Sequence, residues 1–190
     1  MLPASSSRTL CGLLFAVTLV APATQAQDTP KPSAPALYAS TTIDLGTVVS
    51  DLEKSAKWYT EVLGMKELPS FEAPGEFAGK IGLSNKLSFK VRVFTLGEGE
   101  HATKLKLMQF KTSPGARVDQ TFIHSSYGFR YLTLFVSDMD ASIKLAAEKG
   151  AKPIGTGVTP LPEGFPEGIF IAVLRDPDGN FVELVGPKAK

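Results

Sequence analysis

The sequence predicts an α+β domain built from two copies of a βαβββ unit. Each half of the chain reads in the order strand, helix, strand, strand, strand. The segment Val49-Ser50-Asp51-Leu52, where a strand passes into a helix, recurs 87 residues later as Val136-Ser137-Asp138-Met139. The short motif alone would be weak evidence. Because the order of elements matches over two whole halves, the pattern indicates an internal duplication.

We expect residues 1–26 to be a secretory signal peptide rather than part of the fold. Arg8 is their only charged residue, residues 10–21 form an apolar run, and small residues precede a plausible cleavage site after Ala26. The run is too short for a membrane anchor. The protein is therefore expected to be periplasmic or secreted, without membrane association after cleavage.

The remaining chain suits one domain. Residues 27–38 are Pro-rich and polar and are expected to form a flexible leader. The domain covers residues 39–188, with module one at 39–112, a connector at 113–126 and module two at 127–188. Removing Arg8 from 20 basic residues leaves 19, against 19 acidic ones, so no electrostatic surface for nucleic acid is indicated. The only cysteine, Cys11, falls in the signal peptide, which excludes a disulfide scaffold.

Module one begins with a strand rich in β-branched residues at 40–49. Ser50 as N-cap and Glu53 three residues later predict the start of a helix, and Gly64 predicts its end. Three further strands follow, with a short helical turn between the first two. We expect the strands at 65–72, 88–96 and 103–110, and the helical turn at 76–80.

Module two repeats this order. A strand at 129–136 leads into a helix that starts at residues 137–140 and ends at Gly150. A strand at 152–159 and a Pro/Gly loop at 160–168 precede a final hairpin, whose turn is predicted by Pro177 and by Gly179 or Asn180. Glu183 lies in the middle of the last, apolar strand, so its carboxylate requires water, a cation, a metal or a ligand.

Strand alternation divides the side chains between two faces. One face is expected to pack on the helices, and it carries Leu45, Val91, Val93, Leu105, Leu107, Leu132, Leu134, Val182 and Leu184. The other face mixes aromatic residues and methionine with a few charges, as in small-molecule pockets. It includes Arg92, Met108, Thr133 and Phe135. The alternative is a partly solvated sheet face with ordinary ion pairs.

The paired halves, the helix-starting segment at 49–65 and the hairpin Asp-Pro-Asp-Gly-Asn-Phe-Val-Glu-Leu at 176–184 resemble the vicinal oxygen chelate (VOC) superfamily. This superfamily includes glyoxalase I, extradiol dioxygenases, fosfomycin-resistance enzymes and metal-free bleomycin-binding proteins. The resemblance covers about residues 40–188. It implies a curved eight-stranded mixed sheet with helices on the convex face and a ligand cup between the modules. Such modules pair within one chain or across a homodimer, and the sequence leaves both arrangements open.

The resemblance also implies four ligand positions on the first and last strands of the modules. In this chain they are Asp44, Lys106, Tyr131 and Glu183. Only Glu183 has the expected type, and a charged lysine has no lone pair to offer a metal. We therefore expect no cofactor, with a divalent metal as the less favoured alternative. The ammonium of Lys106 is expected to replace the metal's charge by bridging Asp44 and Glu183.

Two functions follow from this set. The favoured one is binding of a small molecule in a metal-free cup. The alternative is a lyase, isomerase or glyoxalase-type enzyme with Glu183 or Asp44 as general base and Tyr131 or Lys106 stabilising an oxyanion. Metal-dependent chemistry is disfavoured by the ligand substitutions, and a scaffold that binds another protein is a further alternative. His124 is a weaker acid/base candidate.

Overall fold

The computed structural model describes residues 40, 42–99, 101–110 and 112–189. The predicted signal peptide and leader lie outside these residues. In this part of the chain, no helix combines the length and the apolar character needed to cross a membrane.

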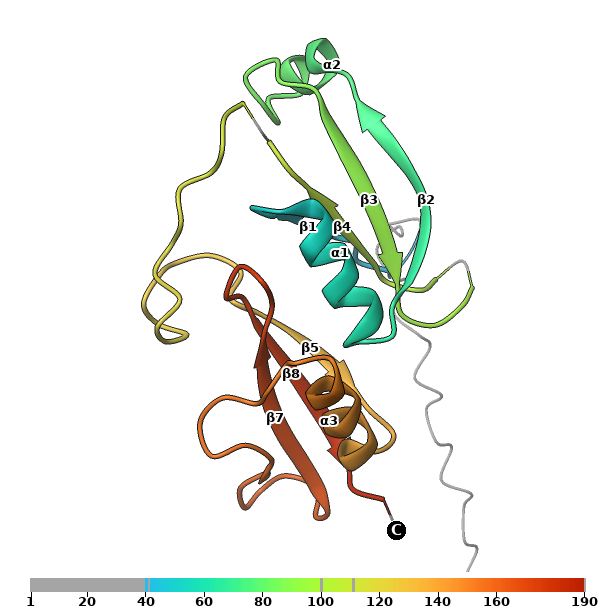
Figure 1. Cartoon of the computed structure of the whole chain (residues 1–190), viewed down its shortest axis with the longest axis vertical. Coiled ribbons are helices and arrows are strands. Elements are labelled where there is room, and N and C mark those ends of the chain that lie inside the picture. The colour runs from blue at the N-terminus through green and yellow to red at the C-terminus, as the bar shows by residue number, and fades with distance from the viewer. Residues whose placement is uncertain (1–39, 41, 100, 111, 190) are drawn as a thin grey trace, which may run out of the picture. The chain divides into compact units, whose positions relative to one another are not determined.

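Each module contains one four-stranded mixed sheet (Figure 1). In both sheets the first strand of the module runs parallel to the last, and all other neighbours are antiparallel. The strand orders are β1-β4-β3-β2 and β5-β8-β7-β6, so the predicted duplication is confirmed. Module one consists of β1 (Leu45–Val48), α1 (Leu52–Glu61), β2 (Lys66–Ala73), α2 (Gly75–Lys80), β3 (Phe89–Thr95) and β4 (Lys104–Met108). Module two consists of β5 (Tyr131–Phe135), α3 (Met139–Glu148), β6 (Thr159–Pro160), β7 (Ile169–Arg175) and β8 (Phe181–Pro187).

The α+β class is confirmed, but the strands do not form one continuous sheet. Between the described residues, β1 bonds only to β4 and β5 only to β8, which leaves two separate sheets of four strands. The strand expected at 152–159 was also largely wrong, because only Thr159–Pro160 pairs as β6. Gly155 and Gly157 adopt φ values of +62° and +87° there, which interrupt an extended backbone.

The helix starts are shifted by one residue from the prediction. Asp51, not Ser50, is the N-cap of α1, and its carboxylate accepts a hydrogen bond from the backbone N–H of Lys54 at 3.0 Å. Asp138 caps α3 in the same way, as the repeated motif would require. Glu53 therefore does not complete a capping box; its side chain reaches across to β3 instead.

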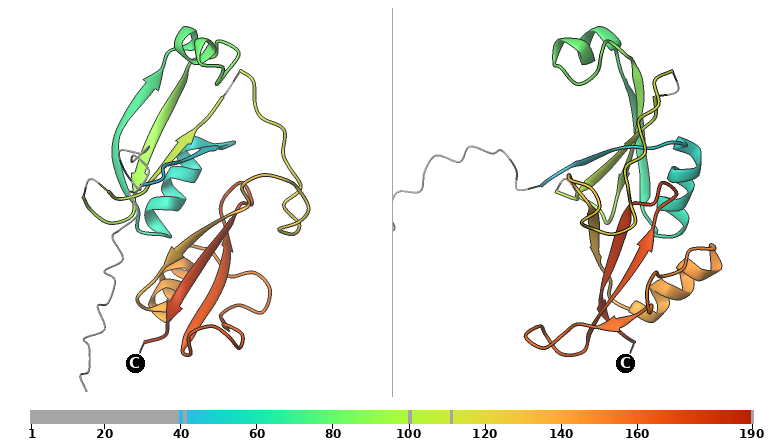
Figure 2. Two further views of the ribbon diagram at one scale, coloured as in Figure 1. Left: turned by 180° about the vertical axis from the view of Figure 1, so that it is seen from behind. Right: turned by 90° about the vertical axis from the view of Figure 1, so that its left-hand side faces the viewer.

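The main core lies between the helices and one face of each sheet. Figure 2 shows α1 and α3 each lying against the sheet of its own module. The largest fully buried side chains of this core include Leu107, Met139 and Leu174. Gly186 is needed in β8 because a Cβ there would lie 2.0 Å from the carbonyl oxygen of Val136.

The predicted faces of β3 were reversed. Phe94 is completely buried in the core under α1, whereas Val91 and Val93 belong to a second cluster on the other face, where they pack with Ala78 of α2. The register explains this result, because Phe94 pairs with Leu105 and Val93 pairs with Lys106. Arg92 consequently lies on the helix side of the sheet.

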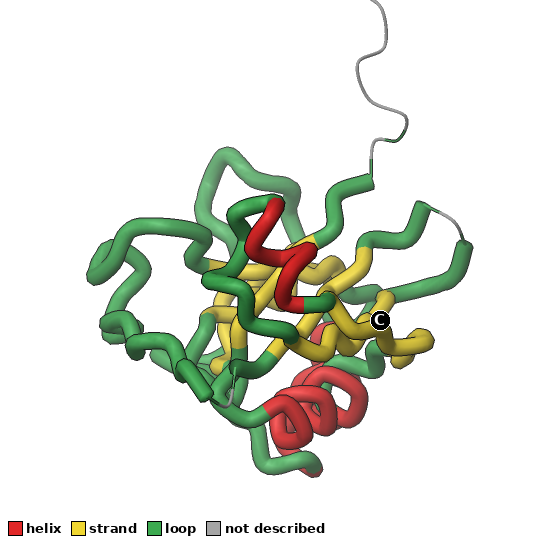
Figure 3. The backbone as a smooth tube through the Cα atoms, turned by 90° about the horizontal axis from the view of Figure 1, so that it is seen from above, coloured by secondary structure: helices red, strands yellow, loops and turns green. Residues whose placement is uncertain are grey.

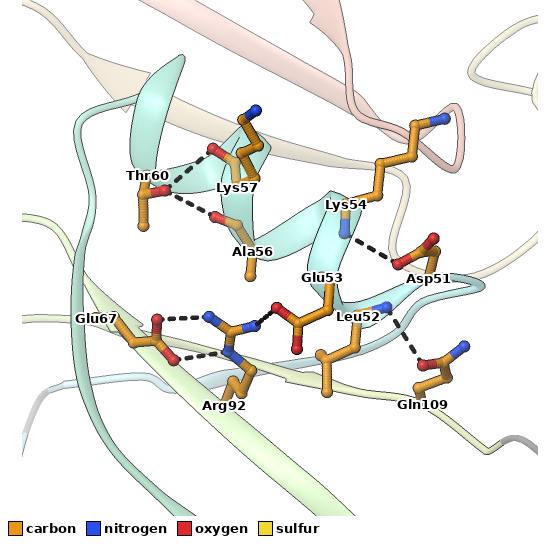
Figure 4. Close-up of polar contacts among 10 residues, drawn as sticks. All are labelled: Asp51, Leu52, Glu53, Lys54, Ala56, Lys57, Thr60, Glu67, Arg92 and Gln109. Atoms are coloured by element: carbon orange, nitrogen blue, oxygen red, sulfur yellow. Dashed lines mark hydrogen bonds and ion pairs between the residues drawn. The ribbon is translucent and has the colours of Figure 1, made fainter.

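Arg92 joins three elements of module one (Figure 4). Its guanidinium donates two hydrogen bonds of 2.6 Å to the carboxylate of Glu67 in β2 and one of 2.7 Å to Glu53 in α1. The hydrogen bonds from Arg92 hold the pKa of Glu67 below its usual value. These contacts hold β2, β3 and α1 together. Because Arg92 lies on the helix side of the sheet, its predicted position on the ligand-lined face was wrong.

The hairpin turn of module two is anchored on module one. Asp176 is buried and accepts hydrogen bonds from the backbone N–H groups of Asp178 and Asn180, at 2.9 and 2.8 Å. Its other carboxylate oxygen accepts a 3.0 Å hydrogen bond from the buried hydroxyl of Tyr59 on α1. Gly179 takes the positive φ that the turn requires, +88°.

Candidate functional site

The predicted pair of Lys106 and Asp44 forms in module one. Lys106 is in β4, Asp44 lies just before β1, and the Lys106 Nζ is 2.8 Å from the Asp44 Oδ2. Leu105 and Leu107 point into the core under α1, so alternation places Lys106 on the opposite face. Both side chains are about one-third exposed. The hydrogen bond from Lys106, more than any other cause, holds the pKa of Asp44 below its usual value.

The second predicted carboxylate has a different partner. Glu183 in β8 pairs in register with Thr133 in β5, and the Thr133 hydroxyl donates a 2.7 Å hydrogen bond to the Glu183 Oε2. No ion pair within 4.0 Å joins Lys106 to Glu183 in the structure, as far as the described residues go. The prediction that Lys106 bridges both carboxylates is therefore correct for Asp44 and wrong for Glu183.

A cavity of about 450 Å³ lies between the free edges of β1 and β5. Asp44 and Tyr131 are the two predicted site residues that line it. Apolar walls come from Ile43, Val48 and Phe129. The cavity joins residues from the first strand of each module, as expected for a site shared by a duplicated fold.

The remaining predicted residues are not among those that line this cavity. Met108 lies two residues after Lys106 in β4. Its side chain lies over Gly46, because a Cβ added to Gly46 would be 3.3 Å from the Met108 Cε. Phe135 lies at the far end of β5 and is largely exposed. His124 is an exposed connector residue whose ring stacks on Phe122, with ring centroids 5.6 Å apart.

Arg130 supports the connector, which can be followed as a long loop by its colour in Figure 1 and belongs to the loops drawn in green in Figure 3. Its guanidinium donates to the carbonyl oxygens of Ile123 and Asp119 and to the side chain of Gln120. Among the residues that the structure describes, these hydrogen-bond partners all lie in the connector, so the guanidinium stabilises the local structure there.

The donor set does not fit a divalent metal. The part of the chain that the structure describes contains no group of three or more His, Cys, Asp or Glu side chains arranged to hold an ion. Lys106 occupies one of the four ligand positions that the resemblance implies. Its ammonium is hydrogen-bonded to Asp44, and a charged ammonium repels a cation. A metal would have to displace this ion pair.

Sequence reasoning missed a second cavity, of about 640 Å³. It is lined by the ends of β1 and β4, the connector and the turn after β7, including Gln109, Arg117 and Asp178. The buried contact between Tyr59 and Asp176 was also missed. Both depend on segments more than 50 residues apart, and the only signal was the Asp-Pro-Asp-Gly-Asn turn, whose first aspartate can accept hydrogen bonds from its own backbone.

The chain is an α+β protein with a duplicated βαβββ fold, and polar residues lie on or next to the first and last strands of each module. Residues 43–184 match the profile of the Glyoxalase/Bleomycin resistance protein/Dioxygenase superfamily. The chain belongs to this superfamily, as its residue motifs indicated. Comparison with curated proteins gave no match.

Solved structures share the fold at low sequence identity. A glyoxalase family protein from Bacillus cereus is 18% identical, with a TM-score of 0.65, covering 82% of this chain and 100% of that chain. Glyoxalase I from Zea mays is 21% identical, with a TM-score of 0.58, covering 78% of this chain and 45% of that chain. A glyoxylase/bleomycin resistance protein/dioxygenase domain from Frankia sp. EAN1pec is 22% identical, with a TM-score of 0.55, covering 80% of this chain and 93% of that chain. Such likeness establishes the fold alone.

Proposed function

We propose that the protein binds a small organic molecule in the β1–β5 cavity without a metal ion. One observation carries the proposal: the ammonium of Lys106 lies 2.8 Å from Asp44, beside a cavity of about 450 Å³ that Asp44 and Tyr131 line. A fixed positive charge at this place makes a bound cation unnecessary and leaves the cavity free for an organic ligand. The volume is within the usual range of small-molecule sites, about 300–1,000 Å³.

The lining suggests the chemistry of the ligand. Tyr131 offers both an aromatic face and a hydroxyl, Phe129 offers a second aromatic ring, and Ile43 and Val48 supply aliphatic surface. A flat, partly aromatic molecule with a hydrogen-bonding group near Asp44 fits these walls.

Binding is favoured over catalysis by the state of Asp44. Its pKa is lowered by Lys106, and a carboxylate with a lowered pKa is a poor general base near neutral pH. Glu183, the other base considered, has one of its oxygens engaged by Thr133. We also propose export, based on the N-terminal sequence; N-terminal sequencing of the exported protein should begin at Gln27.

Metal content tests the first half of this proposal. Elemental analysis of the purified protein should show no stoichiometric Zn, Ni, Mn or Fe, and adding these ions should not raise its melting temperature. Lys106→Met removes the ammonium that would repel a metal ion, so this variant tests the role of Lys106 in excluding a metal. Lys90→Met, at an exposed lysine, is its control. One tightly held equivalent of metal in the wild type, lost in Glu183→Ala, would contradict the proposal.

Ligand binding tests the second half. A library of small aromatic compounds can be screened by thermal shift and verified by calorimetry. Tyr131→Ala should weaken binding of any hit by at least about tenfold, the effect of roughly 1.4 kcal/mol. Phe165→Ala, which alters an exposed aromatic residue outside the cavity, should leave binding unchanged. A hit that binds both variants equally would show that the site lies elsewhere, and conversion of the hit to product would show an enzyme.

A further inference from the structure

The second cavity, of about 640 Å³, lies where three segments that are distant in the sequence meet. They are the ends of β1 and β4, the connector, and the turn between β7 and β8, which can be found by their colours in Figure 1. We call this space the junction cavity. It is larger than the β1–β5 cavity of about 450 Å³, and its volume is within the usual range of small-molecule sites.

Ser50 connects the three segments around the junction cavity. Its backbone N–H donates a 3.0 Å hydrogen bond to the carboxylate of Asp178, and its carbonyl oxygen accepts one of 2.6 Å from the side chain of Gln109. The guanidinium of Arg117, in the connector, donates a longer hydrogen bond of 3.4 Å to the Ser50 hydroxyl. The polar part of the lining is therefore a hydrogen-bonded frame that exists before a ligand arrives, which lowers the cost of binding.

This frame retains hydrogen-bond donors. A side-chain amide nitrogen carries two N–H groups, and a guanidinium carries five. Among the residues that the structure describes, the amide nitrogen of Gln109 has one acceptor, the Ser50 carbonyl oxygen. The amide nitrogen of Gln120 likewise has one, the Asn180 Oδ1 at 2.9 Å. Each glutamine therefore keeps one N–H for a ligand that brings acceptor oxygens.

Arg117 supplies the accessible charge of the junction cavity. Its side chain is 72% exposed, whereas that of Asp178 is 13% exposed. The Arg117 Nη1 lies 3.8 Å from the Asp178 Oδ1, which is longer than a hydrogen bond. The guanidinium is thus attracted to Asp178 without being engaged by it in a short hydrogen bond. Its fork of N–H groups can accept the two oxygens of a carboxylate from a ligand.

The rest of the lining favours an organic ligand over a simple ion. It is largely apolar and includes Val48, Val49, Phe110, Pro114 and Val118. Val48 and Val118 are each about half exposed, at 51% and 53%, so a ligand that covers them removes apolar surface from water. A phosphate dianion suits the cavity less well than a carboxylate, because one guanidinium cannot balance two charges and Asp178 would repel them.

We propose that the junction cavity is a second binding site, which takes a small organic carboxylate. The carboxylate pairs with Arg117 and accepts hydrogen bonds from the N–H groups that the frame retains, and the apolar body packs on Val48 and Val118. This site is distinct from the one proposed in the β1–β5 cavity. Val48 and Asn180 line both cavities, but Arg117 and Asp178 line the junction cavity alone.

The test is an NMR titration of the isotope-labelled protein. Cyclohexanecarboxylate is the probe, and cyclohexanecarboxamide, which has the same apolar body without the charge, is its matched control. The carboxylate should shift the side-chain amide signals of Gln109 and Gln120 in a saturable manner. The uncharged amide should bind at least about tenfold more weakly, and added salt should weaken binding of the carboxylate.

Variants identify the charge that is responsible. Arg117→Met should weaken binding of the carboxylate at least about tenfold and leave binding of the amide unchanged. Val118→Lys, which adds a cation to the lining, should strengthen binding of the carboxylate by about threefold or more, and Val118→Glu should weaken it by a similar factor. Lys152→Met, at an exposed lysine outside both cavities, is the control and should bind as the wild type does. Circular dichroism verifies that each variant is folded.

Three results would overturn the proposal. They are a lack of saturable binding of cyclohexanecarboxylate, equal binding of the carboxylate and its amide, and undiminished binding of the carboxylate by Arg117→Met. Tyr131→Ala separates the two cavities, since it should leave binding of this probe unchanged. A loss of binding in Tyr131→Ala would place the probe in the β1–β5 cavity and would also overturn the proposal. None of these results decides whether aromatic compounds bind in the β1–β5 cavity, which the screen described above tests separately.

Discussion

The hydrogen bond from Tyr59 to Asp176 should contribute measurably to stability. Tyr59→Phe removes one buried 3.0 Å bond to a carboxylate without creating a large cavity. Asp176 keeps its other donors, the backbone N–H groups of Asp178 and Asn180 and the Asn180 side chain. The lost bond to a charged group is therefore expected to cost about 2 kcal/mol of unfolding free energy, within the range of roughly 1.5–3 kcal/mol.

This loss can be measured by urea unfolding followed through Trp58, the only tryptophan, whose ring centroid is 5.0 Å from that of Tyr59. For a domain of this size, about 2 kcal/mol corresponds to a decrease of roughly 4–8 °C in Tm. Tyr131→Phe is the matched control, because its hydroxyl is on a half-exposed ring and its loss should change stability by less than about 0.5 kcal/mol.

The pH dependence provides an independent check. Burial, and then the charge of Asp176, raise the pKa of Tyr59 well above its usual value. A group whose pKa is raised on folding stabilises the protein below its unfolded pKa, about 10 for tyrosine, and loses that contribution as the pH rises further. The wild type should therefore lose about 1.4 kcal/mol per pH unit above pH 10 that Tyr59→Phe does not lose. A variant with unchanged stability and an unchanged alkaline profile would refute the reasoning.

Three further predictions follow from the packing and the site. Ser55→Ala should leave stability unchanged or raise it by up to about 1 kcal/mol, because the buried Ser55 hydroxyl has no hydrogen-bond partner among the described residues; a loss in urea unfolding would reveal a partner. Gly186→Ala should cost about 3 kcal/mol or more, since the new Cβ would overlap the backbone of Val136, and normal expression and Tm would contradict this. The carboxyl pKa of Asp44, followed by NMR, should rise toward about 3.9 in Lys106→Met. In the wild type, the stabilisation from this pair should disappear as the pH falls through the lowered pKa of Asp44. An unchanged titration in the variant would show that the ion pair does not form in solution.

The local signals in the sequence were sufficient for the architecture. A polar capping residue before an amphipathic segment and glycine after it are short-range features. They placed both main helices to within a few residues, although the N-cap of α1 is Asp51 and not the predicted Ser50. The first and last strands of each module followed from the repeat. Since Lys106 is in β4 and Asp44 immediately precedes β1, the strand that pairs directly with β4, their contact could also be anticipated.

The faces of β3 could not be predicted from alternation. Phe89, Val91 and Val93 are apolar on one side, and Phe94 is apolar on the other. Both sides of this strand are in fact covered, one by α1 and one by α2, so the period-two pattern could not choose between them. The assignment of Arg92 failed for this reason, because its position depends on two glutamates brought close only by the tertiary fold.

The partner of Tyr59 stands 117 residues further along the chain. During synthesis, which proceeds from the N-terminus, α1 exists long before the aspartate that completes its surroundings. The Tyr59 hydroxyl therefore lacks this acceptor until the last hairpin has been made, and a truncation that removes the hairpin would remove the hydrogen bond. The last hairpin thus supplies a hydrogen bond that the first helix needs for its native surroundings.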